Sequence, residues 1–218
     1  MAVQLICCSH SPLMTTDVEE TENGVHAQFF REIEQCSAAL HKFSPDLVVI
    51  FGPDHFNGFF YELMPMFCIG TAAQGSKDWH LESGPLRVPR ELAINCVRYL
   101  HSRDFDVALS HEMKVDHGIT IPLFKLTGAL AHYNVLPIFI NCAADPRPSF
   151  RRVRNFGNAI GEFFADKGMR ITIIGSGGLS HDPPTPRLEM SPPDVAQRLI
   201  KRQTPTQDEL DAREGRVV

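Results

Sequence analysis

The sequence contains no apolar run that approaches the about 18 residues a membrane-spanning helix requires. Positive charge is not in excess either. The formal net charge is -5 at pH 7, so the chain has no general attraction to nucleic acid or anionic lipid. The start, MAVQLICCSHSP, has no basic region and too short an apolar stretch for a signal peptide. We therefore expect a cytoplasmic protein that has neither a nucleic acid nor a membrane as its partner.

Paired cysteine motifs are also missing. The six cysteines show no C-x-x-C spacing and lie mostly in apolar segments, which indicates reduced, buried thiols rather than a disulfide framework. Cys7 and Cys8 stand close to His10 and could join a metal site. Because a strand alternates its faces and neither cysteine has a C-x-x-C partner, we favour a buried strand for this segment.

Three common catalytic motifs are absent. The glycines of GSGG at 175–178 form neither G-x-G-x-x-G nor a P-loop, so a nucleotide site has little support. Ser176 and Ser180 in GSGGLSH do not form the G-x-S-x-G elbow of a hydrolase. The chain also has no internal repeat and no low-complexity block.

What is present is the composition of an ordinary globular protein, with 43% hydrophobic and 22% charged residues in 218. Segments with apolar residues at helical spacing alternate with short apolar runs, which predicts a single α/β domain with a mainly parallel central sheet and helices on both faces. We expect a catalytic domain at 1–203 and a polar tail at 204–218. The predicted strands are 3–8, 46–51, 61–70, 105–110, 134–142 and 170–175, and the predicted helices are 25–43, 88–103, 118–128, 149–168 and 193–202.

Histidines follow the predicted strands at the edge where parallel α/β sheets bind their ligands. Five of the ten histidines lie a few residues past a strand, in loops that also carry proline or glycine. One such histidine would usually be a loop residue bonded to a backbone carbonyl, but four strand ends that share the feature favour a common site. The histidines are His10, His55, His111, His117 and His181, after the predicted strands 3–8, 46–51, 105–110 and 170–175.

Several converging imidazoles suit a divalent transition metal such as Fe(II) or Zn(II). Two histidines and one carboxylate on one face of the ion leave open positions for substrates, and further histidines can then move protons. A metal-dependent hydrolase, a metal-free binding protein and an oxygenase all remain compatible with this pattern.

Five motifs together resemble the class III extradiol ring-cleavage dioxygenases. They are SHSP at 9–12, GPDHFNGFFYELMPMFCIG at 52–70, KVDHG at 114–118, LPIFIN at 136–141 and GSGGLSHDPPTP at 175–186. The resemblance covers nearly the whole chain. It implies Fe(II), O2, a small-molecule catechol substrate and a homo-oligomer.

The motifs are most similar to those of family members that cleave 2,3-dihydroxyphenylpropionate or its cinnamate analogue. The resemblance therefore implies meta cleavage to 2-hydroxy-6-oxonona-2,4-dienedioate in the catabolism of aromatic compounds. A related catechol is the alternative substrate. Four cations are equally open as partners of the substrate carboxylate, namely Arg87, Lys125, Arg147 and Arg187.

The resemblance also implies residue roles. His10 and His55 match the two iron-binding histidines of the family, His117 matches its proton donor, and His181 matches its proton acceptor. Asp116 is either an orienting residue beside His117 or the N-cap of the following helix. His111 has no counterpart in the family.

The sequence departs from the family at the third iron ligand, a glutamate in a downstream helical segment. Glu189, Glu209 and Glu214 are the glutamates after His181, and none has the expected context. We expect the third ligand beyond residue 218, so the chain reads as a truncated and impaired form of a longer enzyme. Trp79 is predicted to serve as a lid or as an oligomer contact.

Overall fold

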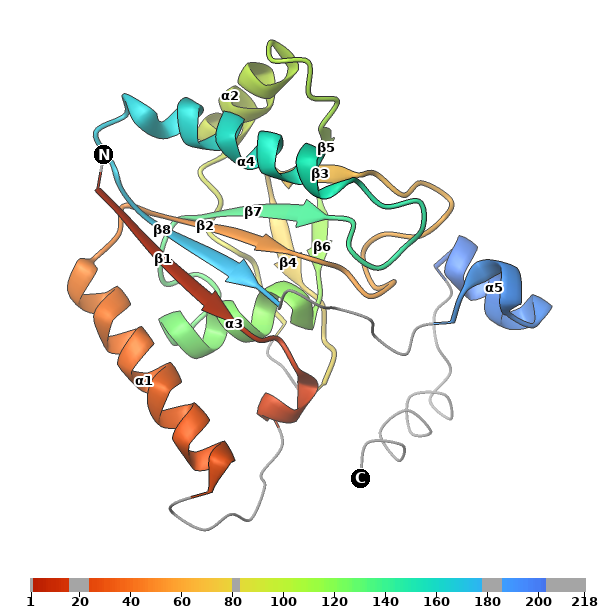
Figure 1. Cartoon of the computed structure of the whole chain (residues 1–218), viewed down its shortest axis with the longest axis horizontal. Helices are drawn as coiled ribbons and strands as arrows, with labels where there is room; N and C mark the ends of the chain where they lie inside the picture. The colour runs from red at the N-terminus through yellow and green to blue at the C-terminus, as the bar shows by residue number, and fades with distance from the viewer. Residues whose placement is uncertain (1, 16–23, 80–82, 178–185, 203–218) are drawn as a thin grey trace.

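The computed structural model describes residues 2–15, 24–79, 83–177 and 186–202. Within them, apolar strand segments assemble into a six-stranded sheet (Figure 1). In spatial order the strands are β1 (Ala2–Cys8), β8 (Arg170–Ser176), β2 (Leu47–Gly52), β7 (Val135–Ile140), β3 (Phe67–Gly70) and β5 (Ala108–Ser110).

Strand direction divides this sheet into two parts. β1, β8, β2 and β7 run parallel to one another, whereas β3 is antiparallel to β7 and parallel to β5. The mainly parallel sheet predicted from the sequence is confirmed. Because of this reversal, β3 and β5 end at the opposite edge of the sheet from β1, β8 and β2.

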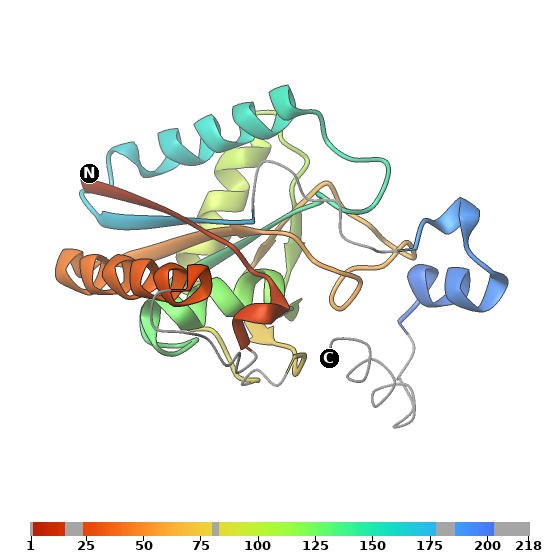
Figure 2. The same ribbon diagram turned by 60° about the horizontal axis from the view of Figure 1, so that its bottom comes forward.

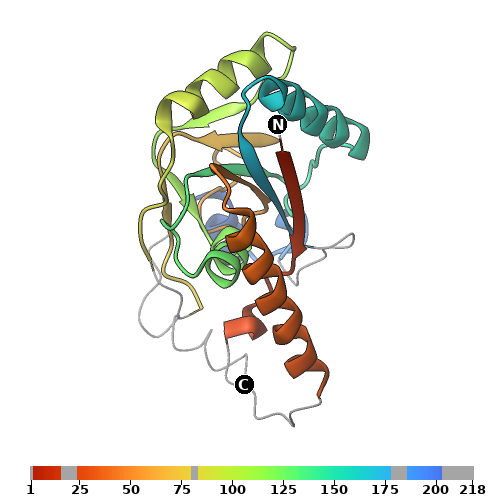
Figure 3. The same cartoon turned by 90° about the vertical axis from the view of Figure 1, so that its left-hand side faces the viewer.

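Helices cover both faces of the sheet, as predicted. Figure 3 shows α1 (Val25–Phe43) and α3 (His117–Thr127) on one face and α2 (Arg90–His101) and α4 (Phe150–Ala165) on the other. The uninterrupted apolar run of β2 follows from this arrangement. Val48 and Ile50 pack toward α1 and α3, and Leu47 and Val49 pack toward α2 and α4, so all four are buried.

One prediction about the strands is wrong in part, and one sheet was not predicted. The predicted strand 61–70 begins only at Phe67, because residues 60–63 form a turn closed by the Leu63 N–H and the Phe60 carbonyl, and Pro65 has no N–H to donate. Two polar segments that were not predicted as strands form a small parallel sheet. Its strands are β4 (Ala73–Gly75) and β6 (Met113–Val115), each too short to show a period.

A short helix, α5 (Pro193–Ile200), ends the described part of the chain and lies apart from the sheet (Figure 2). It follows η2 (Leu188–Met190), and its end accepts hydrogen bonds from the backbone of the 61–62 segment. No helix of the described residues has the length and apolar character needed to cross a membrane.

The cysteines are free thiols, as predicted. Burial raises the pKa of Cys68 and of Cys96 to about 12, and burial together with the neighbouring Cys36 and Cys7 raises that of Cys8 to about 11. The burial prediction fails for Cys7, which is exposed because β1 is an edge strand. Cys8 points into the core, so neither thiol contributes to the site described below.

The aromatic core of the α4 face gives a stability prediction. Phe156 is fully buried and stacks on Phe67 with ring centroids 4.3 Å apart. Phe156→Ala should therefore lower the free energy of unfolding by about 3–5 kcal/mol, measured by urea denaturation, since it removes a large apolar side chain and leaves a cavity. Phe150 on the same helix is 90% exposed, so Phe150→Ala should change stability by about 0.5 kcal/mol or less. Equal losses in the two variants would contradict this assignment of the core.

Candidate metal and catalytic site

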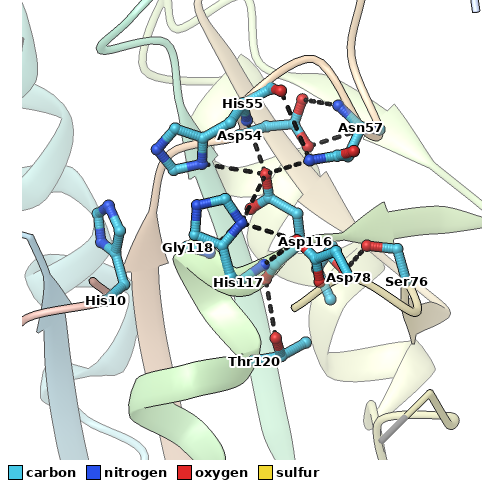
Figure 4. A network of polar contacts seen from close by, with 12 residues as sticks. His10, Asp54, His55, Asn57, Ser76, Asp78, Asp116, His117, Gly118 and Thr120 are labelled. Carbon is cyan, nitrogen blue, oxygen red and sulfur yellow. Dashed lines mark hydrogen bonds and ion pairs between the residues drawn. The ribbon is translucent and has the colours of Figure 1, made fainter. Parts of the chain in front are cut away.

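Three histidine rings meet beside the carboxyl ends of β1 and β2 (Figure 4). His10 follows β1, His55 follows β2, and His117 is the first residue of α3. The ring centroid of His10 lies 5.1 Å from that of His55 and 5.9 Å from that of His117, and the rings of His55 and His117 stack at 4.2 Å. The backbone packs closely here. A side chain at Gly118 would meet the Pro53 carbonyl oxygen at 2.9 Å, so glycine is required after His117.

Asp116 orients the ring of His55. Its Oδ2 accepts hydrogen bonds from Nδ1 of His55 at 3.0 Å, from the His55 backbone N–H at 2.7 Å and from the side-chain amide of Asn57 at 3.0 Å. A carboxylate only accepts, so Nδ1 of His55 carries the proton and Nε2 carries the lone pair. Burial alone would raise the pKa of Asp116, but the His55 hydrogen bond, the charges of His117 and His55, and the Asn57 hydrogen bond lower it below its usual range.

His10 is held by a hydroxyl group. Its Nδ1 lies 2.9 Å from Oγ of Ser176, the last residue of β8. The same hydroxyl donates to the carbonyl oxygen of Gly118 in α3. His10 is buried just past the end of β1, and this contact joins its ring to β8 and α3.

His117 is oriented by a second carboxylate, Asp78. Oδ2 of Asp78 accepts from Nδ1 of His117 at 2.7 Å and from its backbone N–H at 3.1 Å. Burial by itself lowers the pKa of His117, but the Asp78 hydrogen bond and the charges of Asp116 and Asp78 outweigh it and raise the pKa above its usual value. A raised pKa keeps the imidazolium, which is the proton-donating form, present at higher pH than in an ordinary histidine.

Asp54 shapes the loop that carries His55. Its carboxylate accepts from the backbone N–H groups of Asn57, Gly58 and Phe59 at 2.8–3.1 Å. These bonds lower the pKa of Asp54, yet burial and the nearby Asp116 charge dominate and raise it. Gly58 is required in this loop because a side chain there would lie 2.2 Å from the Lys114 carbonyl oxygen.

The donor set fits a divalent metal ion. One nitrogen or oxygen each from His55, Asp116 and His117 lie within 4.8 Å of one another, a group that does not include His10. These short distances do not by themselves make Asp116 a metal ligand. Its Oδ2 already accepts three N–H bonds, so we assign Asp116 as an orienting residue. A metal lies about 3 Å from the centre of an imidazole that binds it, so ring centroids 5.1 Å apart allow His10 and His55 to share one ion.

The structure brings His117 to the site by a route that differs from the one predicted. The prediction placed it past the carboxyl end of the strand before it, but that strand, β5, ends at the opposite edge of the sheet. The chain returns through β6, and Asp116 then starts α3 with His117 as its first residue. Of the two alternatives for Asp116, the structure shows the N-cap, since Oδ1 accepts from the Gly118 N–H, and the side-chain hydrogen bond of Oδ2 is to His55 rather than to the adjacent His117.

His111 stays at the far edge, where its Nδ1 lies 2.7 Å from Oγ1 of Thr71. It therefore has no part in the site, in agreement with its lack of a family counterpart. His181, Glu209 and Glu214 lie outside the described residues. Glu189 is exposed in η2, and the third metal ligand stays a prediction.

Sequence reasoning missed three residues of the site, namely Asp54, Asn57 and Asp78, and it missed the contact of Ser176 with His10. Asp78 stands in a polar segment with no periodic pattern, 39 residues before the histidine it contacts. Ser176 was considered only as a nucleophile. Its partner His10 is 166 residues away, and no local signal predicts such a pair.

Comparison with known families identifies the family of this chain. The profile for the catalytic LigB subunit of aromatic ring-opening dioxygenase matches residues 4–213. The chain belongs to this family. The resemblance to class III extradiol dioxygenases is therefore confirmed, and the α/β sheet is the framework of a ring-opening dioxygenase.

Three relatives of this chain share the name 2,3-dihydroxyphenylpropionate/2,3-dihydroxicinnamic acid 1,2-dioxygenase. The protein of Photorhabdus laumondii is 45% identical over 220 residues, covering all of this chain and 68% of the relative. That of Azotobacter vinelandii is 42% identical, covering 100% and 69%. That of Mycolicibacterium gilvum is 46% identical, covering 99% and 68%. The chain thus spans about two thirds of the length of these ring-cleaving relatives.

The hydrogen bonds of Asp116 give a prediction about metal binding. In Asp116→Asn an amide NH2 replaces one carboxylate oxygen, so either the Gly118 N–H or the donors from His55 lose their acceptor. We expect the affinity for Co²⁺, measured by calorimetric titration, to fall by about 10–100-fold, as for other partners of metal-binding histidines. Asp145→Asn, which removes an exposed ion pair with Arg147, is the control and should leave the affinity unchanged. Equal affinities in the two variants would contradict an orienting role.

Proposed function

We propose that this chain catalyses the Fe(II)-dependent extradiol cleavage of 2,3-dihydroxyphenylpropionate, or of its cinnamate analogue, by O2. The observation that carries the proposal is the convergence of His10, His55 and His117 in one site of a LigB-family chain. The names of its relatives support the substrate class. The product would be 2-hydroxy-6-oxonona-2,4-dienedioate, with both oxygen atoms retained.

In this proposal His10 and His55 hold the metal through their Nε2 atoms. A bound Fe(II) ion would lower the pKa of the catechol hydroxyl groups and bring the substrate and O2 together. The two histidines supply neutral ligands, and the buried Asp116 increases the basicity of His55 through its hydrogen bond. A third protein ligand is still needed to complete the two-histidine, one-carboxylate arrangement.

The other two histidines would move protons. His181 accepts a proton from a substrate hydroxyl group, as the family motif implies. His117 donates a proton from Nε2, because its Nδ1 is engaged by Asp78. Figure 4 shows the Nε2 side of His117 facing the space between the three rings, where a substrate oxygen bound near His10 and His55 would lie.

The positions of the four cations considered support two of them as the proposed partner of the substrate carboxylate. Arg87 donates to the His132 carbonyl and pairs through its own carbonyl with Val135, at the amino end of β7 and away from the site. Lys125 lies over the Phe30 ring in the last turn of α3. Of the four cations considered, Arg147 follows the carboxyl end of β7 and Arg187 precedes η2, so these two are our candidates.

An oxygen-electrode experiment tests the proposed activity. The chain is loaded with Fe(II) under anaerobic conditions, mixed with 2,3-dihydroxyphenylpropionate and then exposed to air. We expect uptake of one O2 per substrate and a yellow ring-fission product. A hydrolase would consume no O2, and a metal-free binding protein would leave the substrate unchanged, so either result would refute the proposal. The homo-oligomer and the cytoplasmic location stay predictions.

Trp79 provides a direct measure of substrate binding. It is the single tryptophan of the chain, and its ring centroid lies 6.2 Å from that of His117 in an edge-to-face contact. Its φ of 49° is rare for a bulky residue, and its indole is half-buried. We expect anaerobic addition of 2,3-dihydroxyphenylpropionate to the Fe(II)-loaded chain to quench its fluorescence in a saturable way.

The control ligand for this experiment is 3-phenylpropionate, which lacks the two hydroxyl groups and should cause no saturable quenching. A catechol titration without any change in emission would show that Trp79 lies away from the bound substrate. Its assignment as a lid would then lose its support.

A further inference from the structure

The interior of α3 contains a proline, and this leaves a backbone carbonyl without its helical partner. In an α-helix the carbonyl of residue 118 accepts from the N–H of residue 122. Pro122 has no N–H, and its ring crowds the carbonyl four residues earlier. Gly118 and Pro122 are both buried, so water does not serve as the replacement donor.

Ser176 supplies the missing donor. Its Oγ–H, at the end of β8, donates to the Gly118 carbonyl oxygen. A carbonyl oxygen can only accept a hydrogen bond, so the single hydroxyl proton of Ser176 is committed to this bond. The hydroxyl oxygen can then only accept from its other neighbours.

The other neighbour is the ring of His10. Nδ1 of His10 lies 2.9 Å from Oγ of Ser176, and because that oxygen must accept, Nδ1 must carry the proton. The lone pair of the neutral ring is then on Nε2, the nitrogen that a metal would use. An imidazole in water prefers the opposite tautomer, with the proton on Nε2, so the choice is made by the surrounding protein.

We propose that Ser176 is a positioning residue for His10, and that its hydroxyl group selects the tautomer and the ring direction in which Nε2 faces the metal. Pro122 makes this possible by leaving the Gly118 carbonyl as the acceptor for the hydroxyl proton. The proposal rests on the role of His10 as a metal ligand in the proposed function. In this proposal Ser176 accepts from Nδ1 of His10, as Asp116 accepts from Nδ1 of His55 and Asp78 from Nδ1 of His117.

The tautomer can be measured without any metal. Nitrogen NMR of the metal-free chain labelled with ¹⁵N-histidine distinguishes the two ring nitrogens, and the His10 signals are assigned by their loss in His10→Ala. We expect a single Nδ1–H form of His10 in the unsubstituted chain. In Ser176→Ala we expect the Nε2–H form to predominate.

Metal affinity is the second readout, with Co²⁺ as the probe. Ser176→Ala should weaken Co²⁺ binding by about 10–100-fold, and Ser176→Thr, which retains a hydroxyl group, should restore it to within about threefold. The matched control is Ser37→Ala. Ser37 also donates its hydroxyl proton to a carbonyl of α3, that of Leu126 at 2.9 Å, but it has no histidine partner among the residues that the structure describes. Its removal should leave the Co²⁺ affinity and the His10 tautomer unchanged.

A double substitution distinguishes two roles of Ser176, the positioning of His10 and the support of α3. When Ser176→Ala is combined with Pro122→Ala, the new N–H at residue 122 satisfies the Gly118 carbonyl, and thermal stability should recover toward that of the unsubstituted chain. The Co²⁺ affinity and the His10 tautomer should not recover. The double variant also serves if Ser176→Ala alone does not fold.

Recovery of the Co²⁺ affinity in the double variant would overturn the proposal, because Ser176 would then act only by supporting the helix. An unchanged His10 tautomer in Ser176→Ala would overturn it too. Failure of the proposed function is a different result, in which His10→Ala binds Co²⁺ as tightly as the unsubstituted chain.

Discussion

His55→Ala is expected to abolish metal binding at the site and to reduce ring cleavage to the background rate. His55 is the ligand candidate with the strongest support, since Asp116 holds its ring through both the side chain and the backbone N–H. Loss of the imidazole removes a ligand outright. It should therefore weaken metal binding by more than the about 100-fold upper limit expected for loss of an orienting partner.

Metal content after desalting and O2 uptake measure this effect. The control is His111→Ala, because His111 is also a histidine close to a strand end but lies at the opposite edge of the sheet, against Thr71. It should retain metal and activity. If His55→Ala bound metal as well as His111→Ala does, the metal site would have to lie elsewhere.

His117→Gln is expected to lower kcat by about 10²–10⁴-fold, the usual contribution of a general acid. Glutamine has a similar size, but its amide group does not act as an acid near neutral pH. Because His117 is assigned to proton transfer rather than to the metal, the variant should retain its metal and its affinity for the catechol. Stopped-flow kinetics under single-turnover conditions would separate the slow chemical step from substrate binding.

His181→Gln completes this test, because it should impair the removal of the substrate proton and leave the later donation intact. The two variants should therefore stall at different stages, with different absorbing species. Wild-type rates in both variants would refute the acid and base assignments. Loss of metal in His117→Gln would make His117 a ligand instead.

Much of the fold could be predicted because local patterns are strong in this chain. The helix at 25–43 was predicted with the bounds that the structure has, since its apolar residues keep one helical face over five turns. The strand at 61–70 was placed badly because its aromatic and aliphatic residues fit a strand and a loop that packs on the core equally well. Met64 illustrates this, as it packs against the core from outside β3.

By itself, the sequence determined the parallel core of the fold and the family, and it identified His10, His55 and His117. The periods of strands and helices and the residues of motifs are local features, so the sequence shows them without knowledge of the packing. Only the tertiary structure decided that β3 and β5 run backward, which removes His111 from the site and brings His117 in through β6 and α3.

Tertiary structure alone also decided how each ring is held. The partners Ser176 and Asp78 come from segments 166 and 39 residues away from the histidines they contact. A hydrogen bond depends on the position of two groups in space, and nothing in the local sequence of either group encodes it.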